Sequence, residues 1–359
     1  MTVKSMDEWQ RLSVKILQAA GANESNAQSV AEALVKADLR GVHSHGLRQL
    51  PGYVKAIRNG ELMPTAYPEI REESPTTALV SSNWTFGQVG ARFAIKVAIA
   101  KANKHRVAVV SLVEAHHIGR LGEYAEVAAD QGMVSMIFSG GYGVEKPVAV
   151  PYGGRRPVLS TNPLAMGFPA GKGPPVIIDY ATTVVAGSKI TQARDRKESL
   201  PTDTIVDKDG NPTTNPSDFF EGGALIPFGG HKGYALMVAT ELWGRILTGA
   251  DRFTKNPRGG MVYGHTGTTM IVFKNDLFQT LEACQQQVDT LQKQLHAVPP
   301  ATGFEKVLVP GDLEDQAERK QRQDGIALPE DTWKGLVVLL TELGLEDPCK
   351  NRTHERRMQ

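Results

Sequence analysis

Short apolar strands alternate with amphipathic helices between residues 76 and 138, and this alternation constrains the fold more than any other feature of the chain. The strand segments are rich in Val and Ile or Thr, whereas the segments between them have apolar residues at helical spacing. Such alternation predicts a largely parallel sheet with helices on both faces. The predicted strands are 76–82, 107–113 and 133–138, and the predicted helices are 90–105 and 119–132.

Helical patterns flank this region at both ends of the chain. Ser5, with Glu8 three residues later, is a capping box that opens one helix, and a second helix begins at about Asn23. Residues after about 311 are helical again, and the charged tail 350–359 is expected to fray. We therefore predict an α/β domain over 76–310 and a helical domain built from 1–75 and 311–359.

The overall charge argues against one large class of function. Forty Lys and Arg side chains balance thirty-nine Asp and Glu, so the net charge is +1, without the basic excess of a nucleic-acid-binding protein. No stretch reaches the roughly 18–20 apolar residues of a membrane span, and the N-terminus lacks the apolar segment of a signal peptide. Two cysteines, Cys284 and Cys349, fit a reducing compartment, so we expect a cytoplasmic protein that contacts neither nucleic acid nor membrane.

Three familiar ligand-binding motifs are absent or incomplete. After Gly141 and Gly143 the chain continues as Val-Glu-Lys, so the GxGxxG of a Rossmann dinucleotide fold is missing. The stretch 167–173 (GFPAGKG) lacks the first glycine and the Ser or Thr of a phosphate-binding loop. The stretch 207–212 (DKDGNP) has Pro212 where a calcium loop requires glycine, so it is expected to form a surface turn.

A first candidate site lies where a helix gives way to the turn GVHSHG at 41–46. Arg48 has the planar guanidinium that binds both oxygens of a carboxylate, and a histidine of the turn would exchange a proton near neutral pH. Ser44 and Tyr53 flank these groups. A surface turn with Arg48 in a salt bridge explains the same residues, and spacing alone does not decide between the two.

His116 and His117 follow the apolar strand 107–113 and precede a helix. The C-terminal ends of strands are where α/β proteins place ligand sites. Because neighbouring residues at a strand end point in opposite directions, we expect one of the two histidines to face a cleft. A core or surface histidine is the alternative. A metal site shared with the His-Ser-His turn would require a carboxylate ligand, for which nothing selects Asp179.

Small polar residues cluster in the loops of the α/β region. Their backbone N–H and hydroxyl groups are suited to phosphate binding without a glycine fingerprint. One cluster opens a helix, whose first N–H groups form a candidate anion site together with Lys232. The clusters are Gly153-Gly154, Ser160-Thr161-Asn162-Pro163, Asp179-Tyr180-Ala181-Thr182-Thr183 and Gly229-Gly230-His231-Lys232-Gly233.

These motifs and the blocks around them resemble the type II malate/L-lactate dehydrogenase family of NAD(P)-dependent 2-hydroxyacid dehydrogenases. The similarity covers nearly the whole chain, and the sequences of its motifs are most similar to the hydroxycarboxylate dehydrogenase branch of the family. It implies a three-layer, non-Rossmann α/β domain with a mixed sheet, a helical domain from both chain ends, and a homodimer. The blocks include ADLRGVHSHGLRQLPGYV, HHIGRLGEYAEVAADQGMVS, VPYGGRRPVLSTNPLAMGFP, IIDYATT, GALIPFGGHKGYAL and PGDLEDQAERKQRQDGIAL.

The resemblance assigns roles to residues of both histidine motifs. His117 and His45 occupy the positions of a proton donor or acceptor, and which of them acts stays open. Ser44 and Arg48 look like substrate-orienting neighbours, with Arg48 on the substrate carboxylate, and Tyr53 would line the same pocket. The implied reaction is reversible hydride transfer between NAD or NADP and a small 2-oxo or 2-hydroxy acid, without a metal ion.

The resemblance also implies a cofactor site in the α/β domain and just beyond it. Two departures from the family pattern bear on this region. The longer segment 139–147 alters the surroundings of Ser139, and Val-Glu-Ala before the histidine pair bears on the orientation of His117. The implied cofactor contacts are Ser139, Asn162, Asp179, Tyr180, Ala181, Lys232, Gly311, Asp312 and Leu313.

Other functions stay open from the sequence alone. The same machinery would also reduce a cyclic imine carboxylate or a diketo sugar acid. The histidine pairs would suit a metal-dependent hydrolase, which chelators should inhibit. The altered residues before His117 leave room for a non-catalytic relative that acts as a dimeric binding protein.

Overall fold

The computed structural model describes residues 2–346, so the predicted fraying of 350–359 lies outside the described residues. The chain divides into two compact units, Met1–Ala66 with Asp312–Gln359 and Tyr67–Gly311. The helical domain was predicted to extend to residue 75 and to resume at residue 311. Strand β2 (Glu69–Glu73), which lies within the predicted helical segment 1–75, pairs with β3 (Thr77–Ser81) in the sheet of the second unit.

Residues from both ends of the chain meet in a two-stranded sheet of the first unit. Strand β1 (Thr2–Lys4) pairs antiparallel with β12 (Ile326–Leu328). The fully buried Trp9 reinforces this pairing, because its indole Nε1 donates to the Ile326 carbonyl at 3.0 Å. The Trp9 ring also packs edge-on against Trp333, at 5.7 Å between centroids. These contacts fix the first helix of the chain against its last strand and helix.

The other elements of the first unit are helices. Ser5 and Glu8 form the predicted capping box, and Asn23 caps the second helix by accepting the Asn26 N–H, so both helix starts are confirmed. The helical elements are α1 (Met6–Ala19), α2 (Glu24–Leu39), η1 (His43–His45), η2 (Leu47–Gln49), α3 (Leu50–Arg58), α11 (Asp312–Asp324) and α12 (Glu330–Glu342).

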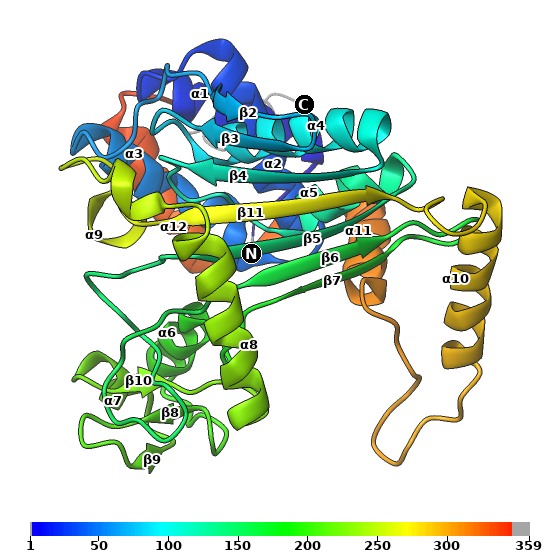
Figure 1. The fold of residues 1–359 in the computed structure, drawn as a ribbon. Coiled ribbons are helices and arrows are strands. Elements are labelled where there is room, and N and C mark those ends of the chain that lie inside the picture. The colour runs from blue at the N-terminus through cyan, green and yellow to red at the C-terminus, as the bar shows by residue number, and fades with distance from the viewer. Residues whose placement is uncertain (1, 347–359) are drawn as a thin grey trace, which may run out of the picture. The chain divides into compact units, whose positions relative to one another are not determined.

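A seven-stranded sheet forms the centre of the second unit, with its strands in the order β2-β3-β4-β11-β5-β6-β7. The β3–β4 pair is parallel, and every other neighbouring pair is antiparallel. Figure 1 shows β11 running through the middle of this sheet, between strands that come much earlier in the chain. The remaining strands are β4 (Val107–Val113), β5 (Met133–Gly140), β6 (Leu164–Phe168), β7 (Val176–Tyr180) and β11 (Gly267–Lys274).

The prediction of a largely parallel sheet is therefore wrong, although its strands and helices are present. Strand β11 separates β4 from β5 and runs antiparallel to both, so that Thr268 faces Leu112 on one side and Ser139 on the other. The alternation within residues 76–138 does not predict where β11, which begins at residue 267, joins the sheet. The mixed sheet implied by the family resemblance is confirmed.

Helices cover both faces of this sheet, so the unit has three layers. Helices α4 (Gly87–His105) and α5 (Gly122–Asp130) share one apolar core with Met270 of β11. The preceding residue, Thr269, points to the opposite face, where its hydroxyl donates to the Trp243 carbonyl at 2.7 Å. The layer on that face consists of α8 (His231–Glu241) and its π-helical continuation η3 (Leu242–Ile246).

Smaller elements surround these layers. A three-stranded sheet has the order β10-β8-β9. Among residues 2–346, no helix is long and apolar enough to cross a membrane. The smaller elements are α6 (Gly187–Arg196), β8 (Ile205–Val206), β9 (Pro212–Thr213), α7 (Pro216–Phe220), β10 (Ala224–Leu225), η4 (Ala250–Phe253), α9 (Gly260–Tyr263) and α10 (Leu281–His296).

Two of the incomplete motifs have simple structural roles. In the stretch 167–173, the N–H groups of Gly171 and Lys172 donate to the Asp289 carboxylate of α10 at 3.0 and 2.9 Å, so this loop binds an anion of its own chain. In the stretch 207–212, the Asp207 carboxylate accepts the backbone N–H groups of Asp209 and Asn211, which is the predicted surface turn.

Candidate functional site

The turn after α2 is built around a buried carboxylate, Asp38, which is 1% exposed. One oxygen of Asp38 hydrogen-bonds His43 Nδ1 at 2.8 Å, and the other accepts the Leu47 backbone N–H at 2.7 Å. A Cβ on Gly46 would lie 2.2 Å from the Asp38 carboxyl carbon, so the turn closes over this side chain only with glycine there. Asp38 therefore fixes the backbone that carries the His-Ser-His sequence.

Burial and hydrogen bonding both shift the titration of this pair. Desolvation raises the pKa of Asp38, although the hydrogen bonds from His43 and Leu47 act in the opposite direction. The hydrogen bond to Asp38 raises the pKa of His43, and the positive charge of Arg48 opposes that rise. His43 is thus engaged in holding the turn together.

The predicted residues of this turn lie on three consecutive helical elements. Ser44 and His45 are on η1, where the Ser44 hydroxyl hydrogen-bonds His45 Nδ1 at 2.9 Å. Arg48 follows on η2 and is partly exposed. Tyr53 lies on α3 and is 1% exposed, so its ring is buried rather than displayed at a surface.

His116 and His117 lie in the segment 114–121 between β4 and α5, here named the histidine loop. Glu114 has a φ of +52°, which ends the extended conformation of the strand before the histidines are reached. Both imidazole rings therefore pack against the same side chain, Tyr263 of α9, at 4.2 and 5.8 Å between centroids. Strand alternation stops before this pair, and the expectation that only one of the two histidines faces a cleft stays a prediction.

Burial distinguishes the two histidines chemically. Desolvation lowers the pKa of His116 to about 3, so this ring is neutral at physiological pH. The His117 ring lies 6.5 Å from the Tyr142 ring, between centroids, and the Tyr142 hydroxyl hydrogen-bonds that of Tyr263. Burial raises the pKa of Tyr263, which keeps it a neutral phenol. Of this pair, His117 is the candidate for proton transfer, and the nearby rings of His116 and Tyr263 are uncharged.

The backbone of the histidine loop is held from two sides. A Cβ on Gly87 would lie 2.1 Å from the His116 carbonyl oxygen, so the start of α4 packs directly on the loop. The Tyr124 hydroxyl of α5 donates to the Ile118 carbonyl. These contacts leave little freedom for the segment that carries His117.

Charged side chains fix the end of the loop where α5 begins. The Asp179 carboxylate accepts the Gly122 N–H, in the first turn of α5, at 2.7 Å. Arg120 pairs with Glu126 at 2.7 Å, and both side chains are 3% exposed. Desolvation disfavours the charge of Arg120, but the carboxylates of Glu126 and Asp179 raise its pKa. Asp179, predicted to contact the cofactor, is thus also a support of the histidine loop.

Ser139 and Asn162 are buried near the ends of the same strands. The Ser139 hydroxyl, in β5, shares a hydrogen bond with that of Thr268 at 3.0 Å. Asn162 donates from its amide to Glu241 at 2.6 Å and accepts the Ser160 N–H at 3.0 Å. These side chains hold the strand ends together, and their contact with a cofactor stays a prediction.

Tyr180, Ala181 and Lys232 lie on segments that the structure joins. The Tyr180 ring, at the end of β7, packs edge-on against Phe228 at 5.5 Å between centroids. The stretch after it pairs with the approach to α8, because the Phe228 N–H donates to the Thr182 carbonyl at 3.0 Å. Lys232 is exposed in the first turn of α8, whose N-cap has no side-chain hydrogen bond. The structure thus joins two of the small polar clusters.

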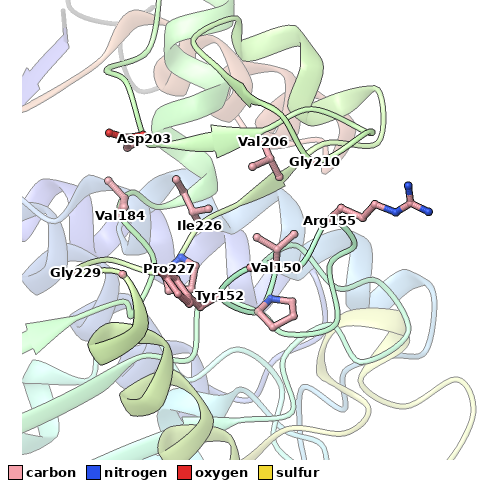
Figure 2. A pocket seen from close by; sticks show the side chains of 14 residues that line it. Val150, Tyr152, Arg155, Val184, Asp203, Val206, Gly210, Ile226, Pro227 and Gly229 are labelled. Carbon is pink, nitrogen blue, oxygen red and sulfur yellow. The ribbon is translucent and has the colours of Figure 1, made fainter.

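A cavity of about 550 Å³ opens beside these segments. Figure 2 shows its lining side chains, which come from the segments between β5 and α8. Two glycine pairs singled out in the sequence, at 153–154 and 229–230, both line it. The full lining is Val150, Pro151, Tyr152, Gly153, Gly154, Arg155, Val184, Asp203, Val206, Gly210, Ile226, Pro227, Gly229 and Gly230.

Gly311, Asp312 and Leu313 lie where the α/β unit ends and helix α11 begins, and their contact with a cofactor stays a prediction. Gly311 has a φ of +101°, and a Cβ there would lie 3.3 Å from the Ile177 backbone nitrogen, in the first half of β7. Asp312 and Leu313 begin α11, and Leu313 is 63% exposed. The structure thus divides these three residues between the two units.

Several residues that shape these sites are not marked by the sequence motifs. Asp38 and Arg120 are charged residues inside the quoted blocks, so a search for buried charges beside the histidines would have found them. Tyr142 lies in the segment that departs from the family pattern. No sequence motif marks Tyr263, because it comes close to the histidine loop only through the strand order of the sheet. Among residues 2–346, no three His, Cys, Asp or Glu side chains form a potential metal site.

The chain is similar to known proteins over nearly its whole length. The sequence profile of malate/L-lactate dehydrogenase matches residues 5–337. The chain belongs to the malate/L-lactate dehydrogenase family. It is 35% identical to the L-sulfolactate dehydrogenase of Methanocaldococcus jannaschii over 350 residues, which cover 96% of this chain and 98% of the relative. It is 31% identical to hydroxycarboxylate dehydrogenase B of Escherichia coli K12 over 334 residues, covering 91% and 90%.

Solved structures share the fold of this dehydrogenase. The delta1-piperideine-2-carboxylate reductase of Pseudomonas syringae superposes with a TM-score of 0.82 at 30% identity, covering 94% of this chain and 100% of the other. The family assignment makes the protein an oxidoreductase of 2-hydroxy acids that uses a nicotinamide cofactor.

The Asp38–His43 pair of the dehydrogenase predicts a pH-dependent stability. The folded-state pKa of His43 is raised above 6.5, so its contribution is complete below about pH 6.5 and is lost as pH rises through the folded pKa. The stability difference between wild type and His43→Gln should therefore shrink from pH 6 towards pH 9. Urea unfolding of both proteins across this range would measure it, and a constant or growing difference would contradict the assignment.

The Asp179–Gly122 hydrogen bond predicts an effect on the histidine loop of the dehydrogenase. Asp179→Ala leaves the Gly122 N–H unpaired, whereas Asp179→Asn keeps an oxygen acceptor there. Loss of a hydrogen bond to a charged group costs about 1.5–3 kcal/mol, so amide exchange at the start of α5 should accelerate roughly 10- to 150-fold in the alanine variant. Hydrogen-exchange mass spectrometry would test this, and equal exchange in all three proteins would remove the supporting role.

Proposed function

We propose that this dehydrogenase transfers a hydride reversibly between NAD or NADP and a small 2-oxo acid, with His117 as the proton donor and acceptor. The histidine loop carries the proposal, because it fixes the backbone around His117 and leaves the neighbouring His116 neutral. Proton transfer in a transition state requires a titratable group held within hydrogen-bond reach of the reacting oxygen. His45, hydrogen-bonded to Ser44, is the second candidate for this role.

The residues around the start of α8 fit a nicotinamide dinucleotide. The N-cap of α8 has no side-chain acceptor, so its first N–H groups and the exposed Lys232 offer positive charge to a diphosphate. When bound, the nicotinamide supplies or accepts the hydride. We propose direct contacts for Tyr180, Ala181 and Lys232, with further contacts or support from Ser139, Asn162, Asp179, Gly311, Asp312 and Leu313.

Residues of the chain itself bind the substrate and transfer the proton. Arg48 binds the substrate carboxylate with two parallel hydrogen bonds, which also set the direction of the carbonyl group. The His117 imidazolium donates its proton to the carbonyl oxygen as negative charge develops there, and the same nitrogen takes the proton back in the reverse reaction. Ser44 orients His45, and the buried Tyr53 supports the helix that follows Arg48.

A second candidate function is the reduction of a cyclic imine carboxylate. The delta1-piperideine-2-carboxylate reductase with the same fold supports it. Such a substrate also has a carboxylate beside the unsaturated carbon, so Arg48 would bind it in the same way. An assay of the purified protein with NADH and NADPH against 2-oxo acids and cyclic imines would decide between the two, and would also show which cofactor is preferred.

We also propose that the enzyme is a homodimer and acts in the cytoplasm. Family resemblance supports the homodimer, and the shortage of cysteines supports a reducing compartment. Leu242, Ile246 and Leu247 follow one another at the end of the α8–η3 helix and are 52%, 55% and 57% exposed, an apolar surface suited to burial against a second copy. Sedimentation analysis would measure the oligomeric state.

The role of His117 predicts a loss of turnover without a loss of cofactor binding. His117→Ala should lower kcat by about 10²–10⁴-fold, which is the usual contribution of general acid–base catalysis. The dissociation constant of NADH should stay near the wild-type value. His45→Ala provides the comparison within the proposal, and His296→Ala, on the exposed end of α10, is a neutral control. Wild-type kcat in His117→Ala would contradict the assignment.

The role of Arg48 predicts a change in substrate affinity. Arg48→Lys keeps the charge and loses the planar pair of donors, so KM for the 2-oxo acid should rise about tenfold or more. The pH dependence of kcat should not change. Steady-state kinetics at saturating cofactor would measure both, and an unchanged kcat/KM for every substrate of the wild type would rule out the clamp.

A further inference from the structure

Three residues at the ends of β3 and β4 have a backbone conformation that residues other than glycine rarely adopt. Glu114, which follows β4, has a φ of +52°, and Asn83 and Trp84, just beyond β3, have φ values of +49° and +59°. Such conformations persist only where the surrounding structure requires them, and they concentrate at functional sites. The contacts that hold Glu114 in this conformation therefore bear on His117, which follows in the same loop.

The two strained turns are joined through their backbones. Strands β3 and β4 run parallel near one edge of the sheet, with Ser81 beside Val113 at their ends (Figure 1). The Ser82 N–H donates to the Val113 carbonyl at 3.0 Å, and the Trp84 N–H donates to the Glu114 carbonyl at 2.7 Å. Each turn thus supports the other, and the histidine loop begins at this pair of turns.

The Glu114 carboxylate is held by side chains of the two neighbouring strands. Its Oε2 accepts a hydrogen bond from the Ser81 hydroxyl at 2.6 Å and another from Arg71 Nη2 at 2.8 Å. The Glu114 side chain is 12% exposed, so these donors replace most of its contact with water. Arg71 also donates to Asn83 Oδ1 at 3.3 Å, and one guanidinium therefore contacts both strained turns.

Arg71 reaches the two turns from a β-bulge. The register between β2 and β3 shifts between Ile70 and Glu72, which makes Arg71 the extra residue of the bulge. Bulges redirect side chains and are frequent next to active sites. The irregularity in β2 thus sets the direction of the guanidinium that crosses the end of β3 to reach Glu114.

The Trp84 ring extends the same support to the other side of the histidines. Trp84 is 5% exposed, and a Cβ on Gly259 would lie 2.6 Å from its Cζ3, so α9 begins directly against this ring. Helix α9 carries Tyr263, on which both histidine rings pack. The strained turns therefore contact both the start of the histidine loop and the helix that packs on it.

We propose that Glu114 and Arg71 are positioning residues for His117. Their ion pair holds Glu114 in the left-handed conformation, and this conformation sets the direction in which the histidine loop leaves β4. The inference rests on the proposed function, since it takes His117 to be the proton donor. It gives a role to Val-Glu-Ala before the histidine pair, one of the two departures from the family pattern.

Removal of the carboxylate tests the proposal directly. Glu114→Ala loses the ion pair but keeps a Cβ, which disfavours a positive φ, so the backbone should relax and displace His117. Because a displacement of about 1 Å can cost about 10²-fold in rate, kcat should fall about 10- to 100-fold. KM for the 2-oxo acid and the dissociation constant of NADH should stay near the wild-type values, since the proton transfer acts in the transition state. Steady-state kinetics and calorimetric titration would measure these quantities.

Glu114→Gly separates the backbone conformation from the ion pair. This variant also lacks the carboxylate, but glycine adopts a positive φ readily, so it should recover most of the kcat that Glu114→Ala loses. An ion pair that only stabilises the fold predicts equal kcat in the two variants at any temperature where both are folded. Thermal unfolding of each variant would establish that temperature range.

The partner residue gives an independent test. Arg71→Met should also lower kcat, and Arg71→Met/Glu114→Ala should lower it no further than Glu114→Ala alone, because the two side chains act as one unit. Glu73→Ala is the matched control. Glu73 also lies on β2 and pairs with Lys101 at 2.8 Å, but its strand partner is Ala78, at the far end of β3 from Ser81. Its kcat should match that of the wild type.

The outcomes separate this inference from the proposed function. Wild-type kcat in Glu114→Ala, or equal kcat in Glu114→Ala and Glu114→Gly, would overturn the positioning role and leave the dehydrogenase reaction intact. An equal loss in Glu73→Ala would also overturn it, because the effect would then be common to ion pairs of β2. Wild-type kcat in His117→Ala would contradict the proposed function itself, and this inference with it.

Discussion

The insertion of β11 between β4 and β5 is the constraint on which the α/β unit depends. Its register places Thr268 between Leu112 and Ser139, at the edge of the sheet where the histidine loop begins. Tyr263 comes only a few residues before this strand, so the same register delivers its ring to the two histidines. Tyr142 follows β5 at the same edge and completes the cluster. One strand pairing thus assembles groups from three distant parts of the chain.

Two carboxylates, one in each unit, have similar structural roles. Asp38 in the helical unit and Asp179 in the α/β unit each accept a backbone N–H at 2.7 Å, from Leu47 and Gly122 respectively. Each fixes a turn that carries a histidine proposed for chemistry. Loss of either carboxylate would leave a backbone N–H unpaired, so each carboxylate favours the one backbone conformation in which this hydrogen bond is made. Hydrogen bonds within the protein therefore preorganise both histidine segments.

Local patterns in the sequence predict much of this structure. Capping residues such as Ser5 and Asn23 locate helix starts correctly, because a cap depends on neighbours within three residues. The strand order is different, since no local pattern states that residues 267–274 join the middle of the sheet. The conformation of His116 and His117 also escapes prediction, as it follows from the positive φ of Glu114 and the arrival of Tyr263. The residue blocks nevertheless indicate the family, because a family can be recognised from its motifs even where local patterns do not predict the strand order.

The pairing of β1 with β12 has a consequence for biosynthesis. The α/β unit ends at Gly311, so it has all of its strands before the ribosome has added α12. The helical unit cannot complete its two-stranded sheet at that point, because Thr2 to Lys4 pair with residues 326–328, which are synthesised later. Although N-terminal segments usually fold first during synthesis, the first helices of this chain complete their core last. Until then, Trp9 of α1 lacks the Ile326 carbonyl and the Trp333 ring that it contacts in the folded protein.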